Sequence, residues 1–333
     1  MIAFDTAFTR LAGIALPIVQ APIGGLARPA LASAVSNAGA LGMLSLTWSD
    51  SEAVEQAITE TMSLTDRPFG VNLILEWPQE ARLRQVLGLG VSVVSLFWGD
   101  PAPYVPIVHE AGGIVLHSVG SADEARRAVD AGVDVVVAQG WEAGGHVRGS
   151  VAALPLVPAV IDAVAPTPVI AAGGIGDGRG LAAVLALGAS AGWLGSRFVL
   201  AAETHAHPIY RERMLAADET STVHSLAFDG AWPDAPHRTL RNSTIDAWEA
   251  AGRPATDRPG EGDTIAVVDD EPILRYSSTS PHDGIVGDAE PLSLWAGQSV
   301  GLIHEVRPAA EIVATIAAEA AEALGLASGL VRR

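Results

Sequence analysis

One stretch of the chain joins a titratable side chain to several glycines: Gln139-Gly140-Trp141-Glu142-Ala143-Gly144-Gly145-His146. It follows the apolar run 133–138, whose length and β-branched content favour a buried parallel strand over a helix. Glycines at the end of such a strand let the backbone approach a flat or anionic ligand closely. An imidazole with a pKa of about 6.5 could accept a proton there at neutral pH. We therefore predict a ligand site with His146 as its catalytic base.

His146 has to be weighed against the chain's other histidines, which number nine with it, because a lone histidine is more often structural. Most of the others fall in a predicted helix or in the irregular part near the C-terminus. The spacing of His205 and His207 could suit a metal, but no carboxylate or cysteine stands close by, so we predict no metal site. Glu142 is either a second catalytic group or a carboxylate that holds the loop or a ligand hydroxyl.

Two glycine-containing turns are candidates for phosphate binding. Gly173 and Gly174 follow the predicted strand 168–172, and Gly195 and Ser196 follow the predicted strand 191–194. In a βα barrel the loops after the seventh and eighth strands commonly hold phosphate through free backbone N–H groups. A tight turn explains one glycine pair equally well, but the pairing of two such strand ends favours phosphate.

Two uncharged amides also lie at strand ends. Asn72 and Gln139 both donate and accept hydrogen bonds, which suits an uncharged heterocycle such as a flavin ring. The alternative, for which the odds are about even, is polar side chains satisfied within the core.

The elements that must position these residues alternate between strand and helix. We expect eight strands and a helix after each of them, the last helix at 207–217. Small-residue turns separate several helices from the next strand, as at Gly39, Gly112, Gly132 and Gly188. The pattern predicts an α/β fold, a (β/α)8 TIM barrel. A doubly wound open sheet is the alternative, but the first βα turn lacks G-x-G-x-x-G. The expected strands are 16–20, 41–46, 69–73, 91–97, 113–117, 133–138, 168–172 and 191–194.

The rhythm stops near residue 218, where Pro, Asp, Arg and Trp become frequent. We therefore divide the chain into a barrel at 1–217, a lid-like substrate subdomain at 218–295, and closing helices at 296–333 that pack on the barrel. The subdomain is too long for a loop. We expect it to be appended or inserted, mostly helical, and to lie over one mouth of the barrel.

Composition excludes several function classes. The formal net charge of -18 argues against binding to nucleic acid or to an anionic membrane. The absence of cysteine excludes disulfides, thiolate nucleophiles and iron–sulfur clusters. The first residues lack the features of a signal peptide, and no uninterrupted apolar run reaches about 20 residues. We expect a cytoplasmic protein, whose oligomeric state is not readable from the sequence.

Several motifs together resemble the nitronate monooxygenase family, also called 2-nitropropane dioxygenase-like. This family is one of the FMN-dependent TIM barrels, to which the flavin-type enoyl-acyl-carrier-protein reductase also belongs. The motifs agree in order and spacing from the first strand to the closing helices. They are Gln20-Ala21-Pro22-Ile23-Gly24-Gly25, Gly70-Val71-Asn72-Leu73, the Gln139 to His146 stretch, Ala171-Ala172-Gly173-Gly174-Ile175, Gly195-Ser196-Arg197-Phe198 and Ala296-Gly297-Gln298-Ser299.

The resemblance implies an FMN cofactor and a role for each matching position. Ala21, Pro22 and Asn72 would meet the flavin ring, and Gln139 would reach its polar edge or the ribityl chain. The phosphate end would be held by Gly145, Gly173, Gly174, Gly195 and Ser196. His146 would deprotonate or orient an alkyl nitronate, which O2 and the flavin convert to a carbonyl compound and nitrite.

Two other functions fit the same residues. One is an NAD(P)H-dependent reductase of enoyl thioesters or quinones, and the other is a non-enzymatic flavin-binding protein. Three departures from the family pattern bear on the site: Val147 separates His146 from Arg148-Gly149, Ser118 replaces a frequent Gln or Lys, and Ser196 replaces a frequent Thr.

Overall fold

The computed structural model describes residues 3–331, so Met1, Ile2, Arg332 and Arg333, at the ends of the predicted ranges, lie outside it. Its centre is an eight-stranded parallel sheet that closes on itself. β1 lies beside both β9 and β2, and a parallel bridge between Val19 and Leu41 closes the seam. The strands are β1 (Ile18–Gln20), β2 (Gly42–Ser45), β3 (Phe69–Ile74), β4 (Val93–Phe97), β5 (Ile114–Val119), β6 (Val135–Gln139), β8 (Val169–Ala172) and β9 (Ala191–Leu194).

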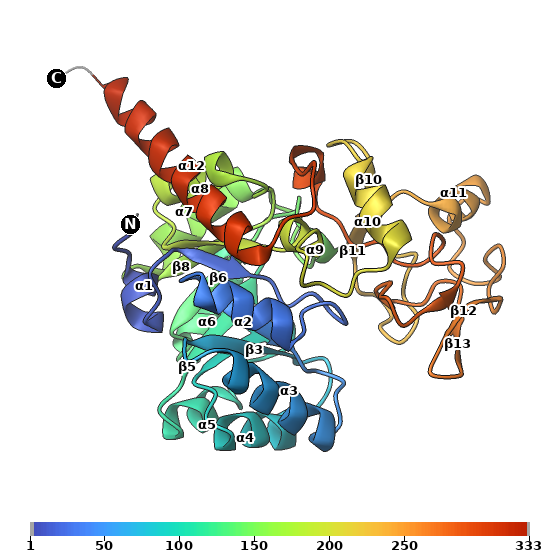
Figure 1. Ribbon diagram of the computed structural model, residues 1–333, viewed down its shortest axis with the longest axis horizontal. Coiled ribbons are helices and arrows are strands. Elements are labelled where there is room, and N and C mark those ends of the chain that lie inside the picture. Colours follow the sequence, from blue (N-terminus) through green and yellow to red (C-terminus); the bar gives the residue numbers. More distant parts are fainter. Residues whose placement is uncertain (1–2, 332–333) are drawn as a thin grey trace.

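Helices surround this barrel, and the predicted TIM barrel is confirmed (Figure 1). Several begin at the residues that favour helix starts, because the side chains of Asp50, Ser121 and Asp177 accept hydrogen bonds from backbone N–H groups of the first turn. The outer helices are α2 (Pro29–Asn37), α3 (Ser51–Leu64), α4 (Glu80–Gly88), α5 (Val105–Glu110), α6 (Ala122–Asp130), α7 (Ala153–Val164) and α8 (Gly178–Ala186).

The last position in the helical layer is filled differently from the prediction. A helix does form near 207–217, namely α10 (Pro208–Leu215), but its buried Tyr210 and Met214 pack with Leu240 and Leu294 of the later chain. The layer between α8 and α2 is closed instead by α12 (Ala309–Gly329), which packs on both of them. α12 therefore occupies the place in the helical layer where the prediction put the helix at 207–217.

The end of the barrel away from the predicted site is plugged. α1 (Ala7–Ala12) places Phe8, which is fully buried, among the inward-facing side chains of the strands, including Val19, Met43 and Ile170. The barrel interior is therefore a packed core, and the space for a ligand lies at the carboxyl ends of the strands.

The segment 218–295 is not mostly helical, and that part of the prediction is wrong. It holds one helix, α11 (Ser243–Ala250), and the strands β10 (Thr222–Ser225), β11 (His237–Leu240), β12 (Thr264–Val268), β13 (Glu271–Leu274) and β14 (Val286–Gly287). The hairpin of β12 and β13 turns at Asp269 and Asp270, both with positive φ, as a tight two-residue turn requires. Figure 1 shows this segment beside the barrel, with its strand β11 next to α9 (Ser196–Val199) and the hairpin of β12 and β13 farthest from the barrel.

A two-residue strand joins the segment to the barrel loop. β7 (Gly145–His146) pairs antiparallel with β11, so that His146 lies opposite His237 and Gly145 opposite Arg238. After the segment, a short 3-10 helix η1 (Gln298–Leu302) leads into α12. Among the described residues, α12 is long and apolar enough to cross a membrane by length and composition, although Glu311, Glu319 and Glu322 interrupt its apolar run. Its Ile312, Val313 and Ile316 pack against the barrel.

Candidate active site

A cavity of about 530 Å³ opens at the carboxyl ends of the barrel strands. Its wall is built from the strand-end loops and from the segment 218–295. Glu142 does not line it, but the predicted base and all the predicted FMN-binding residues do: His146, Ala21, Pro22, Asn72, Gln139, Gly145, Gly173, Gly174, Gly195 and Ser196. The expectation that residues at the carboxyl ends of the strands lie close together therefore agrees with the structure.

His146 lies against aromatic rings on the cavity wall. Its ring stacks on Trp232 with centroids 4.1 Å apart, and Trp295 lies 5.1 Å away. Its Nε2 is buried and has no hydrogen-bond partner among the described residues. Burial, with a smaller contribution from the neighbouring His237, lowers the pKa of His146 to about 3. The imidazole is thus neutral at physiological pH and available for a hydrogen bond to a ligand.

His237, which lies behind His146 and does not line the cavity, makes all its hydrogen bonds within the protein. His237 Nδ1 lies 2.9 Å from the carbonyl oxygen of Ala235, and its Nε2 accepts a hydrogen bond from the backbone N–H of Phe228 at 3.1 Å. Burial lowers the pKa of His237 to about 4. A neutral ring with a proton on Nδ1 satisfies both contacts, so His237 is structural.

Three side chains hold the loop that carries His146. Gln139 Nε2 donates to the carbonyl oxygen of His146 at 3.0 Å. Both carboxylate oxygens of Glu142 accept from the N–H of Ala153, at 3.0 and 2.9 Å, and so cap α7. Arg238 donates to the carbonyl oxygen of Trp141. Of the two roles considered for Glu142, the geometry therefore favours the one that holds the loop.

The opposite end of the cavity is lined by glycine backbone. Gly173 and Gly174 have φ of +95° and +74°, which side chains adopt only with strain. Among residues 3–331, their N–H groups donate to no other atom of the chain. Ser196 Oγ accepts from the N–H of Gly297 at 2.9 Å, which leaves its own hydroxyl proton free to donate. This end of the cavity therefore offers backbone N–H and hydroxyl donors with no large side chain beside them.

Aromatic residues that the prediction did not single out form the outer wall. Trp48 and Trp77 follow β2 and β3, and their rings are 5.5 Å apart. Both come a few residues after predicted strands, so the strand-end rule could have found them. Trp232 and Trp295 come from the segment 218–295 and had no such signal. Within the described part of the chain, no Asp, Glu, Lys or Arg lines the cavity.

The residues that depart from the family pattern lie in different places relative to the cavity. Ser118 lines the cavity, whereas Val147 is fully buried and its N–H donates to the carbonyl oxygen of Pro236. Arg148 points away from the cavity, 3.4 Å from Glu124 and 5.8 Å from the ring of Trp98. The inserted valine therefore joins the loop to the segment 218–295, and Arg148 serves the outer surface.

Comparison with known proteins agrees with this geometry. The family model described as nitronate monooxygenase matches residues 5–83 and 78–319. A (3aS,4S,5R,7aS)-5-hydroxy-7a-methyl-1-oxo-octahydro-1H-indene-4-carboxyl-CoA dehydrogenase of Mycobacterium tuberculosis is 33% identical over 98% of this chain and 99% of its own length. A nitronate monooxygenase of Pseudomonas aeruginosa is 34% identical over 94% of this chain and 98% of its own.

Solved structures give the same assignment. FabK from Thermotoga maritima superposes with a TM-score of 0.81 at 32% identity, over 98% of this chain and 100% of that one. A nitroalkane oxidase from Streptomyces ansochromogenes superposes with a TM-score of 0.77 at 30% identity, over 96% and 100% of the two chains. The chain therefore belongs to the nitronate monooxygenase family of flavin-dependent oxidoreductases.

Proposed function

We propose that the cavity binds FMN and that the protein oxidises alkyl nitronates with O2 to a carbonyl compound and nitrite. One observation carries this proposal: a single cavity joins a glycine-lined end with free N–H donors to a histidine whose buried Nε2 has no partner. The first feature suits a phosphate, and the second suits a small polar substrate.

The residues of the cavity fit FMN. Gly173, Gly174 and Gly195 would hold the phosphate through backbone N–H groups, and the hydroxyl of Ser196 would donate to it. Asn72, whose side-chain amide has no hydrogen-bond partner among the described residues, would meet the ring system together with Ala21 and Pro22. When bound, FMN supplies a one-electron acceptor that O2 reoxidises.

The charge state of His146 favours a nitronate over a neutral nitroalkane. A base with a pKa of about 3 takes a proton from carbon poorly at neutral pH. An alkyl nitronate has already lost that proton and is an anion. His146 would then orient it by a hydrogen bond, while Trp232 and Trp295 exclude water from the reacting atoms.

Product analysis tests the proposal. Aerobic incubation of the FMN-loaded protein with propyl-2-nitronate is expected to release nitrite and acetone in equal amounts. His146→Asn, which has a similar size but no imidazole ring and a shorter reach for its hydrogen bonds, is expected to slow this release. Absence of nitrite from a series of primary and secondary nitronates would overturn the proposal.

A second candidate is an NAD(P)H-dependent reductase or a dehydrogenase of thioesters. It is favoured by the wall of Trp48, Trp77, Phe97 and Trp232, which suits a bulky apolar group, and by the likeness to a CoA-ester dehydrogenase and to FabK. Rapid anaerobic bleaching of the bound flavin by NADH or NADPH, with none by nitronates, would select this candidate.

A further inference from the structure

Arg238, on β11 of the segment 218–295, is a buried cation whose side chain contacts the loop of His146. It is 1% exposed and the largest fully enclosed side chain among the described residues. Its Nη2 donates to the carbonyl oxygen of Trp141 at 3.0 Å, and its guanidinium carbon lies 4.2 Å from the centre of the Trp141 ring. The same side chain therefore holds both the backbone and the side chain of Trp141.

The charge of Arg238 is not neutralised by a direct ion pair. Among the described residues, no carboxylate lies within 4.0 Å of it, and Nη1 reaches only Thr222 Oγ1, at 3.3 Å. Burial lowers the pKa of Arg238, an effect that the more distant Glu142 partly opposes. Because burying an unpaired charge is costly, an apolar side chain would serve simple packing better.

The backbone of Arg238 is tied to the same loop. Arg238 lies opposite Gly145 in the pairing of β11 with β7, one residue from the His237 and His146 pair. Its side chain thus holds the loop at Trp141 while its strand holds the loop at Gly145. Gln139 adds the third point, through its hydrogen bond to the carbonyl oxygen of His146.

We propose that Arg238 is a positioning residue that fixes the ring of His146 in the cavity by clamping the Gln139 to His146 loop to the segment 218–295. The inference rests on the proposed role of His146 but not on the identity of the substrate. It places the orientation of a barrel residue under the control of the added segment.

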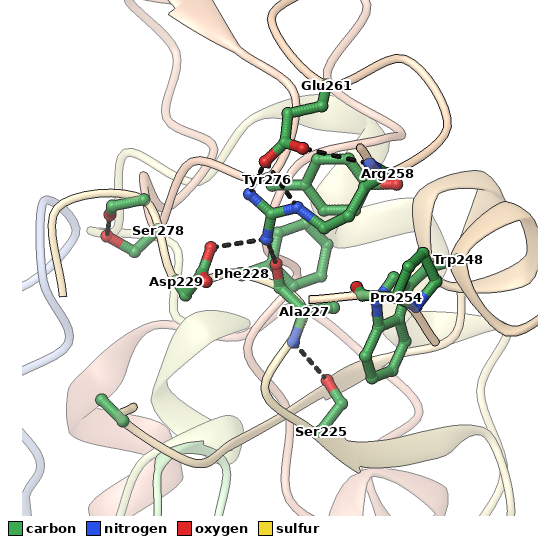
Figure 2. A network of polar contacts seen from close by, with 12 residues as sticks. Ser225, Ala227, Phe228, Asp229, Trp248, Pro254, Arg258, Glu261, Tyr276 and Ser278 are labelled. Carbon is green, nitrogen blue, oxygen red and sulfur yellow. Dashed lines mark hydrogen bonds and ion pairs between the residues drawn. The ribbon is translucent and has the colours of Figure 1, made fainter. Parts of the chain in front are cut away.

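Arg258 offers a matched control within the same segment. Its guanidinium carbon also lies 4.2 Å from an aromatic ring, that of Tyr276, and its Nη1 donates to the carbonyl oxygen of Ala227 at 3.1 Å. Figure 2 shows this arginine among Asp229, Glu261 and Tyr276. Its partners all belong to the segment, and it does not line the cavity.

The test compares Arg238→Lys, Arg238→Met and Arg258→Lys in FMN-loaded protein with ring-labelled histidine. Nuclear magnetic resonance at one pH reports the ring signal of His146, which is assigned by its loss in His146→Asn. Both changes at Arg238 are expected to move this signal, with Met producing the larger shift, whereas Arg258→Lys and the signal of the exposed His109 stay unchanged. This readout needs no turnover and no known substrate.

Kinetics with the electron donor that reduces the flavin gives the second readout. Arg238→Lys is expected to lower kcat about 10- to 100-fold, as misplacement of a catalytic group does, with KM within about threefold. If Arg238→Lys has the same His146 signal and the same kcat as the wild-type protein, the inference is overturned. Equal losses of kcat in the Arg238 and Arg258 variants would also overturn it, since they indicate general destabilisation. If the Arg238 variants shift the His146 signal but the protein does not oxidise nitronates, the inference about Arg238 is supported. The proposed function is then wrong.

Discussion

The ring of His146 stacks on the indole of Trp232, with centroids 4.1 Å apart and planes inclined by 27°. The two residues are far apart in the chain: one ends a barrel loop, and the other belongs to the segment 218–295. Trp232 also makes edge contacts with Trp77 and Trp98 at 5.2 and 5.0 Å. The proposed active site is therefore completed by the added segment.

Replacing Trp232 should change both the stability and the chemistry of the site. Trp232→Ala removes a side chain that is 2% exposed and should lower the free energy of unfolding by about 3–5 kcal/mol. Water then reaches His146, so its pKa should rise toward the ordinary value. Trp232→Phe keeps most of the stacking and should retain activity. Denaturant unfolding and pH profiles of kcat measure these effects, and Trp248→Phe, away from the cavity, is the control. An unchanged profile in Trp232→Ala would contradict the assigned contact.

Loss of the imidazole should affect turnover far more than cofactor binding. His146→Asn is expected to lower kcat by about 10²- to 10³-fold, the range for loss of one side chain that hydrogen-bonds the charge of the reacting group. The FMN content of the purified protein should stay the same, because the glycine end of the cavity is intact. Absorbance of the bound flavin and initial rates are measured together. A variant that loses FMN and activity in parallel would count against a separate role for His146.

A methyl group at the glycine end should expel FMN. Gly174→Ala introduces a Cβ on the cavity wall, at a residue whose φ is +74° and whose backbone N–H donates to no other atom among residues 3–331. Gly112→Ala is the matched control, because Gly112 has the same φ of +74°, open space around its Cβ position and no contact with the cavity. Both changes should cost about 1 kcal/mol of stability through backbone strain, but only Gly174→Ala should raise the Kd for FMN. Equal FMN affinities in the two variants would remove the proposed phosphate site.

The buried histidines should make the fold sensitive to acid. Burial lowers the pKa of His146 to about 3 and the pKa values of His117 and His237 to about 4. The unfolded chain therefore binds more protons than the folded protein between about pH 6.5 and these values. The free energy of unfolding should be fully present above pH 7 and should fall as the pH drops to 4, by up to about 1.4 kcal/mol per pH unit and histidine. Denaturant titrations at pH 7, 6 and 5 measure this, and a flat dependence would show that the rings are not desolvated.

The barrel and most of its site could be predicted because local rules specify them. Apolar runs of strand length, separated by capped helices, indicated the eight strands, and the rule that active sites follow such strands selected Asn72, Gln139 and Gly173. These inferences need only residues close in sequence. They hold even where strand ends differ from the prediction by one or two residues, as at β4.

The parts of the fold and of the candidate site that the sequence did not predict depend on contacts between residues far apart in the chain. Nothing local distinguishes α10 from α12 as the helix that closes the layer, since only packing on α8 and α2 decides it. The pairing of His146 with His237 involves a strand of two residues, too short for an alternating pattern. The stacking of Trp232 on His146 follows from that pairing, and so it became visible only in the folded structure.

The most direct measurement is a pair of anaerobic titrations of the FMN-loaded protein, one with an alkyl nitronate and one with NADH and NADPH in turn. The proposed function predicts that the nitronate changes the visible absorption of the flavin within one turnover, that admitted O2 restores it, and that nitrite appears in proportion. A spectrum unmoved by nitronates but bleached by NADH or NADPH would contradict nitronate oxidation.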